Sequence, residues 1–133
     1  MADVVTERRG VPVLVCGEDG AKVSGVQDAL DLIGSTYHRA EVVALPVARL
    51  DERFFALRTG LAGEIMQKFV NYRITLAVVG DVSAYTAAGT AFRDLVRECN
   101  RGDRTWFLDD LEALDARLGR PGAGSGAVPT ASA

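Results

Sequence analysis

The chain has 133 residues, of which 48% are hydrophobic and 25% charged, and its formal net charge is -3. This length and composition favour one globular domain over two domains or a disordered chain. The small acidic balance argues against nucleic acid or an anionic membrane surface as a partner, and no apolar run reaches the roughly 18 residues that a transmembrane helix needs.

The N-terminal third predicts a hairpin followed by a helix. An apolar run over residues 11–16 ends at a glycine and indicates a buried strand. Residues 3–7 predict a strand before it, and the Arg-Gly pair at residues 9–10 suits a tight turn between the two. Ser24 is expected to cap a helix over residues 25–33, because the apolar side chains of that segment recur on one helical face.

The middle of the chain predicts a strand, a long helix and a second strand. Residues 41–45 are rich in β-branched side chains and are followed by a proline, which favours a central strand that stops there. Residues 60–72 carry apolar side chains on one helical face and polar ones on the other. Residues 74–79 form the most continuous apolar run and predict a buried strand.

The C-terminal part predicts a helix over residues 87–99, a strand over 105–108 and a helix over 111–118 that an aspartate at 109 or 110 caps. Residues 119–133 are mostly Gly, Ala, Ser and Pro and are expected to form a flexible tail.

Strand and helix patterns alternate along the chain, and the expected strands are continuous apolar runs. Both features predict an α/β fold with a single mostly parallel, mixed sheet of 4–5 strands covered by about four helices. We expect this sheet and its helices to form one domain over residues 1–118.

The cysteines and the N-terminal sequence predict a cytoplasmic location. Cys16 and Cys99 lie in unrelated segments, so no disulfide framework is expected and a reducing compartment is favoured. Residues 1–9 lack the ordered basic, apolar and cleavage regions of a signal peptide.

Three segments carry a family resemblance. They are FFALRTGLAGEIMQKFVNYR at residues 54–73, LAVVGD at residues 76–81 and the pattern ExNRG at residues 98–102. These segments resemble a bacterial family that is catalogued as domain of unknown function 4180, over roughly residues 10–118. The resemblance implies relatives but no activity.

The expected order of elements (two strands, a helix, then three strand-helix units) also resembles STAS domains, the fold of anti-sigma-factor antagonists and sulfate-transporter tails. Their switch motif, Asp-Ser-Ser/Thr-Gly-Leu-Gly, begins a helix. Here LRTGLAG at residues 57–63 falls in that place, and the resemblance aligns Thr59 with the serine that STAS switches phosphorylate. Leu57 and Arg58 stand where the family has an acidic residue and the first serine, which puts the kinase-recognition surface in doubt.

Thr59 has two interpretations at the start of this helix. Its hydroxyl can accept a hydrogen bond from the first-turn backbone as a cap. Alternatively, the helix N-terminus with Gly60 and Gly63, beside Arg58, can hold an anion or a phosphothreonine. The T-G-x-x-G spacing is not that of a phosphate-binding loop.

A polar stripe follows on the same helix, formed by Glu64, Gln67, Lys68 and Asn71. It is either a solvated face, with Glu64 and Lys68 paired at i,i+4, or a surface that docks a partner. Gln and Asn are poorer surface fillers than Glu or Lys, which keeps the second interpretation open.

Asp81 follows the central strand at its carboxyl end, where open α/β sheets bind ligands. Alternatively, the Asp81 side chain can cap the loop or helix that follows the strand. We expect it to lie at the same end of the sheet as Arg58, Thr59 and Asn100.

An enzymatic interpretation uses Asp81 or Glu98 as a base and Arg58 or Arg101 as an anion clamp, although their spacing alone does not show that they meet.

No metal and no cofactor are expected, because the single histidine, His38, has no cysteine or carboxylate at ligand spacing. The leading hypothesis is a cytoplasmic STAS-like regulatory or protein-interaction domain without catalytic activity, which binds a protein partner or a second copy of itself. The alternative is a small anion-binding protein or small enzyme with a site at the carboxyl ends of the strands.

Overall fold

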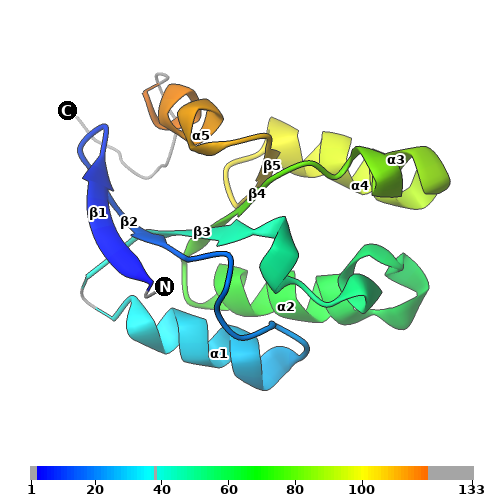
Figure 1. Cartoon of the computed structure of the whole chain (residues 1–133), viewed down its shortest axis with the longest axis horizontal. Coiled ribbons are helices and arrows are strands. Elements are labelled where there is room, and N and C mark those ends of the chain that lie inside the picture. Colours follow the sequence, from blue (N-terminus) through cyan, green and yellow to red (C-terminus); the bar gives the residue numbers. More distant parts are fainter. Residues whose placement is uncertain (1–2, 38, 120–133) are drawn as a thin grey trace.

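The five strands form one sheet in the order β1-β2-β3-β4-β5 in a computed structural model, which describes residues 3–37 and 39–119 (Figure 1). The strands are β1 (Val4–Arg8), β2 (Val11–Val15), β3 (Val42–Pro46), β4 (Thr75–Val79) and β5 (Thr105–Leu108). β1 pairs antiparallel with β2, and the other neighbours are parallel. The predicted α/β fold with one mostly parallel, mixed sheet is therefore confirmed.

The expected turn between β1 and β2 is present at Arg9 and Gly10. Both residues have a positive φ, of 54° and 81° respectively. Two successive positive φ angles are typical of the two-residue turns that match the twist of a hairpin. The predicted tail begins at residue 119, the last described residue, and its residues 120–133 lie outside the described residues.

In the described part of the chain, five α-helices follow or connect the strands: α1 (Val26–Ser35), α2 (Leu61–Asn71), α3 (Ser83–Ala88), α4 (Thr90–Arg101) and α5 (Leu111–Leu118). Three of them match predicted helices with shifted ends, α5 has the predicted bounds, and α3 was not expected. Gly89 has an extended backbone, with φ -149° and ψ 129°, which separates α3 from α4. Three short 3-10 helices, η1 (Val47–Arg49), η2 (Glu52–Phe55) and η3 (Leu57–Thr59), lie between β3 and α2.

Ser24 does not cap α1, which corrects the expectation from the sequence. The N-cap residue is Gly25, and it provides no side-chain cap. Instead, the carboxylate of Asp28 in the first turn accepts a hydrogen bond from the backbone N–H of Ser24, at 2.8 Å. An acidic side chain that reaches back from the first turn satisfies a donor before the helix, as in one half of a capping box.

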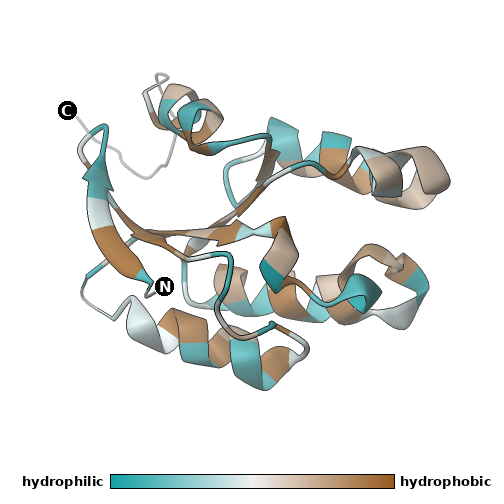
Figure 2. Cartoon of the chain, in the orientation of Figure 1, coloured by the Kyte–Doolittle hydropathy of each residue, from teal (hydrophilic) through white to brown (hydrophobic). Residues whose placement is uncertain are grey.

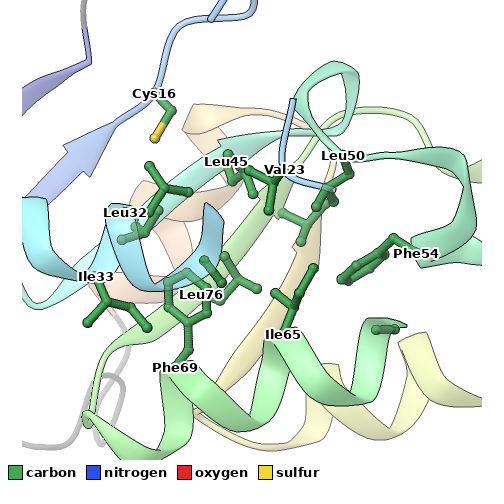
Figure 3. Packing of buried hydrophobic residues seen from close by; sticks show 14 of the residues in the cluster. Cys16, Val23, Leu32, Ile33, Leu45, Leu50, Phe54, Ile65, Phe69 and Leu76 are labelled. Carbon is green, nitrogen blue, oxygen red and sulfur yellow. The ribbon is translucent and has the colours of Figure 1, made fainter. Parts of the chain in front are cut away.

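The larger part of the hydrophobic core lies between one face of the sheet and helices α1, α2 and α4. Because the parallel strands follow one another in order and crossovers are right-handed, the connecting helices fall on the same face. In Figure 3 the side chains of Ile33 from α1 and Phe69 from α2 lie close to Leu76 of β4. Phe54 and Phe55 of η2 belong to this core and extend it into an aromatic cluster with Tyr85 and Phe92.

Only α5 packs on the other face of the sheet within the described part of the chain. Figure 1 shows α1 and α2 below the sheet and α5 above it. Leu114 and Leu118 of α5 pack with Trp106 of β5, and Arg8 of β1 donates hydrogen bonds of 2.6 and 2.9 Å to the carboxylate of Asp115. A helix of 8 residues covers only part of a five-stranded face. Figure 2 shows that the strands of the sheet are largely hydrophobic.

Among the described residues, no helix is both long and apolar enough to cross a membrane.

Candidate functional site: a groove at the carboxyl ends of the strands

A groove of about 480 Å³ lies at the carboxyl ends of β2, β3 and β4, beside the start of α5. Its floor comes from strand residues on the face that carries α5: Val15, Ala44, Pro46 and Val79. Its rim carries four carboxylates: Glu18, Asp109, Asp110 and Glu112. We call this feature the acidic groove. Its volume is within the range of ligand pockets, roughly 300–1,000 Å³.

The strand ends that border the acidic groove depend on residues that stop a strand. Gly80 follows β4 with a φ of 136°, in a region that side chains rarely adopt. A Cβ atom at this position would also lie 3.0 Å from Cγ2 of Val47. The backbone N–H of Gly80 donates to the carbonyl of Leu108 at 2.9 Å, which keeps β4 and β5 together up to the groove.

The four rim carboxylates differ in their contacts. Asp110 is the N-cap of α5, and its carboxylate accepts a hydrogen bond of 2.8 Å from the backbone N–H of Ala113. Glu18, Asp109 and Glu112 are exposed, and no other described residue forms a hydrogen bond or ion pair with their side chains. Among the residues that the structure describes, no basic side chain lines the groove. The groove therefore favours a cation or a basic group over an anion.

Cys16 borders the groove but is not available as a nucleophile. Burial, followed by the nearby Asp3 carboxylate, raises the pKa of the Cys16 thiol to about 12. The sulfur lies among core residues and points toward Leu32 of α1 (Figure 3). A thiol that stays protonated at neutral pH is a poor nucleophile and a poor metal ligand.

Thr59 is exposed and its hydroxyl is engaged with the local backbone. The Oγ1 atom lies within donating distance of the carbonyl oxygens of Arg53 and Ala56, at 2.7 and 2.8 Å. It also accepts a hydrogen bond of 3.3 Å from the N–H of Leu61, the first residue of α2. The N-cap residue is Gly60, with a φ of 79°, so Thr59 supports the helix start from one position earlier.

The polar stripe of α2 is largely solvent-exposed. Gln67 donates a hydrogen bond of 2.9 Å to Oδ1 of Asn71. The expected ion pair between Glu64 and Lys68 does not occur, since neither side chain forms an ion pair in the described part of the chain. An exposed pair of this kind contributes only about 0.3–0.5 kcal/mol, so solvation of the two charges competes with it.

Asp81 initiates α3. Its carboxylate accepts a hydrogen bond of 2.8 Å from the backbone N–H of Ser83. Hydrogen bonding from Ser83, through its side chain and its backbone, lowers the pKa of the Asp81 carboxyl. This makes the carboxylate a weaker base than an ordinary aspartate, which does not favour the role of general base.

Asn100 lies beside the middle of β5. Its carboxamide accepts a hydrogen bond of 2.8 Å from the N–H of Phe107 and donates one of 3.1 Å to the carbonyl of the same residue. Its neighbour Arg101 is exposed and pairs with Glu98 at 3.3 Å.

Arg58, Thr59, Asp81 and Asn100 are expected from the sequence to lie at the same end of the sheet, and this stays a prediction. No hydrogen bond or ion pair joins any two of them within residues 3–37 and 39–119, and none of them lines the acidic groove. The reason is that Arg58 and Thr59 belong to η3, at the end of a long connection, while α4 returns Asn100 to the side of β5. Polar residues that follow different strands in the sequence therefore need not contact one another in the folded chain.

Sequence reasoning missed Arg49 and the acidic groove. The Arg49 side chain is buried, with 5% of the residue exposed, and it donates to the carbonyls of Ala21 and Gly17 and to Asp3. These bonds fix the segment that carries Glu18. No sequence pattern marks such an arginine. The groove did have a signal, because Asp109 and Asp110 follow the end of β5 as closely as Asp81 follows β4, and Glu18 lies soon after β2.

A family model described as Domain of unknown function (DUF4180) matches residues 8–118. The chain belongs to this family, as its three resembling segments implied. Neither a curated protein nor a solved structure matches the chain. No group of three or more His, Cys, Asp or Glu side chains within the described residues is arranged to hold a metal ion.

Proposed function

We propose that this chain is a cytoplasmic regulatory or protein-interaction domain without catalytic activity, and that the acidic groove is its binding surface. One observation carries the proposal: beside α5, on the second sheet face, lies a groove with an apolar floor and a rim of carboxylates. Apolar surface rimmed by polar groups is typical of interaction sites. The reduced, unpaired Cys16 and Cys99 suit the cytoplasm.

The chemistry of the groove defines the partner. Val15 and Val79 are half-buried and offer contact to an apolar side chain, and exposed carboxylates on the rim attract Lys or Arg. The partner is therefore a protein segment in which an apolar residue is flanked by basic ones. The rim charges increase the association rate and select against acidic segments.

The STAS resemblance supports a regulatory role, and Thr59 is the residue through which regulation would act. The order of elements in the structure is the order on which that resemblance rests. Phosphorylation would require the Thr59 hydroxyl to leave the carbonyls of Arg53 and Ala56. The added charge would then act on Arg58 and on the exposed stripe of α2, formed by Glu64, Gln67, Lys68 and Asn71.

A second candidate function is binding of a small molecule, which the groove volume favours. The carboxylate rim changes the chemistry of this alternative: the ligand would be an organic cation, whereas the sequence suggested an anion. A linear alkyl diamine is a suitable probe, because its methylene chain fits the apolar floor and its ammonium groups fit the rim.

The test is fluorescence anisotropy with a labelled Lys/Leu peptide and a Glu/Leu peptide of the same length. We expect the basic peptide alone to bind, and Glu18→Lys and Asp109→Lys to weaken binding about tenfold or more. Glu41→Lys is the matched control, since Glu41 is exposed at the start of β3, away from the groove.

Equal binding of both peptides, or equal loss in the control, would contradict the assignment of the groove. A diamine that raises the thermal unfolding midpoint of wild type but not of Glu18→Lys, without peptide binding, would favour the second candidate.

A further inference from the structure

The two edges of the sheet differ in how their backbone groups are satisfied. At the β5 edge, the outward N–H and carbonyl of Phe107 are both bonded to the carboxamide of Asn100, at 2.8 and 3.1 Å. The Asn100 side chain, which belongs to α4, thus takes the place that a neighbouring strand would occupy at Phe107. Such covering is one way in which proteins prevent an edge from pairing with another chain.

The β1 edge has no such cover among the described residues. Arg8 and Val11 flank the two-residue turn and form a hydrogen-bonded pair. Every second residue of β1 before Arg8, that is Thr6 and Val4, therefore also directs its backbone N–H and carbonyl at β2. Pro12, the partner of Glu7 in β2, agrees with this alternation. Its carbonyl points away from β1 and accepts a hydrogen bond from the backbone N–H of Glu41, next to β3. Val5 and Glu7 therefore direct their N–H and carbonyl groups outward, away from the sheet.

We propose that β1 pairs antiparallel with β1 of a second copy, which joins two five-stranded sheets into one across a two-fold axis. The inference rests on the sheet edges and does not depend on the acidic groove.

The sequence of β1 is complementary to itself in one register. With the axis at Thr6, Val5 forms hydrogen-bonded pairs with Glu7 of the partner subunit, and Asp3 lies opposite Arg9 of the partner subunit. Moving the axis to Val5 would place Asp3 opposite the partner's Glu7, and like charges oppose that register.

The Thr6 register also covers an exposed apolar side chain. Val4 is 49% exposed, and it would lie against the aliphatic part of Arg8 of the partner subunit. Because the β5 edge is covered by Asn100, each copy offers one open edge. The assembly therefore closes at two copies and does not grow into a fibre.

The first test is sedimentation equilibrium over a range of concentrations. We expect wild type to dimerise and Val5→Pro to raise the dimer dissociation constant about tenfold or more, since proline removes an outward N–H from each copy. Val5→Thr keeps the N–H and should dimerise like wild type. Circular dichroism melting identifies any loss that comes from unfolding of the proline variant.

The second test does not depend on that variant. A Thr6→Cys pair would place the two Cα atoms about 4.5 Å apart in a non-hydrogen-bonded pair, within disulfide range. Under mild oxidation we expect Thr6→Cys to form a disulfide-linked dimer, and Glu7→Cys and wild type to form no covalent dimer. A wild-type chain that remains monomeric at all concentrations, or cross-linking of Glu7→Cys as fast as Thr6→Cys, would overturn the proposal.

Discussion

Arg49 shows how one buried guanidinium organises the segment between β2 and α1. Its Nη1 donates to the carbonyl of Gly17 at 2.9 Å and to the carboxylate of Asp3 at 3.1 Å. The guanidinium occupies the space beside Gly20 where a side chain would begin. Glu18 follows β2 and lines the groove. The position of its backbone segment therefore depends on the hydrogen bonds of Arg49, a residue far along the chain.

Gly20→Ala should destabilise the fold. Its Cβ would lie 2.5 Å from the guanidinium carbon of Arg49, so the arginine must move and weaken its bonds. We expect the free energy of unfolding to fall by about 1–3 kcal/mol in urea denaturation. Gly34→Ala is the control, because nothing lies within 4 Å of its Cβ and alanine suits a helix. An unchanged stability in Gly20→Ala would contradict the packing described for Arg49.

The Cys16 thiol should make stability depend on alkaline pH. Its pKa is raised from 9.0 to about 12 in the folded chain, chiefly by burial. The folded state therefore keeps a proton that the unfolded state releases, and stability is lost as pH rises from about 9 toward 12. The slope is at most about 1.4 kcal/mol per pH unit. Urea denaturation of wild type and Cys16→Ala across this range measures it, and parallel pH profiles would disprove it.

Thr59 separates a structural role from a regulatory one. Thr59→Ala removes the contacts to the carbonyls of Arg53 and Ala56 and the acceptor for Leu61. We expect it to cost about 1 kcal/mol, while Thr59→Ser keeps the hydroxyl and most of the stability. If Thr59 is also a switch, Thr59→Asp should change partner capture. If wild type and the Ala and Asp variants capture the partner equally, Thr59 has no regulatory role and only supports the start of α2.

At the scale of elements, continuous apolar runs identified β2, β3, β4 and β5, because the central strands are largely buried and leave few polar positions. β1 is mostly exposed and was identified from the tight turn that joins it to β2. Helix boundaries were less predictable. The break at Gly89 between α3 and α4 lies in a segment rich in alanine, where helix propensity alone continues the helix. The connection of three 3-10 helices before α2 has no periodic pattern, and only packing of Phe54 and Phe55 explains its path.

The β5 edge depends on both functions of the Asn100 carboxamide. In Asn100→Asp, the carboxylate still accepts from the Phe107 N–H but faces its carbonyl oxygen without a hydrogen to donate. We expect a loss of about 1–3 kcal/mol in thermal or urea unfolding. Asn71→Asp is the matched control, since Asn71 acts only as an acceptor toward Gln67. Equal losses in the two variants would indicate a general effect of added charge.

At the scale of the whole molecule, the fold was predictable and the site was not. From the sequence, the rule that ligands bind at the carboxyl ends of strands was applied to Asp81, whereas the groove at those ends is lined by Glu18 and Asp109. Which strand ends stay open depends on where α5 lies, and α5 is oriented by the bond between Arg8 and Asp115. These two residues are 107 positions apart, and no local pattern reports their contact.

The one-sided arrangement of the connecting helices has a consequence for biosynthesis. Because α1, α2 and α4 all lie on one face, the second face stays bare until the ribosome has released α5. Trp106 and the valines of that face are then exposed on a nearly complete sheet, a state that favours aggregation or chaperone binding. A chain truncated after Asp109 should therefore bind a hydrophobic dye and aggregate, whereas the chain that includes α5 should not.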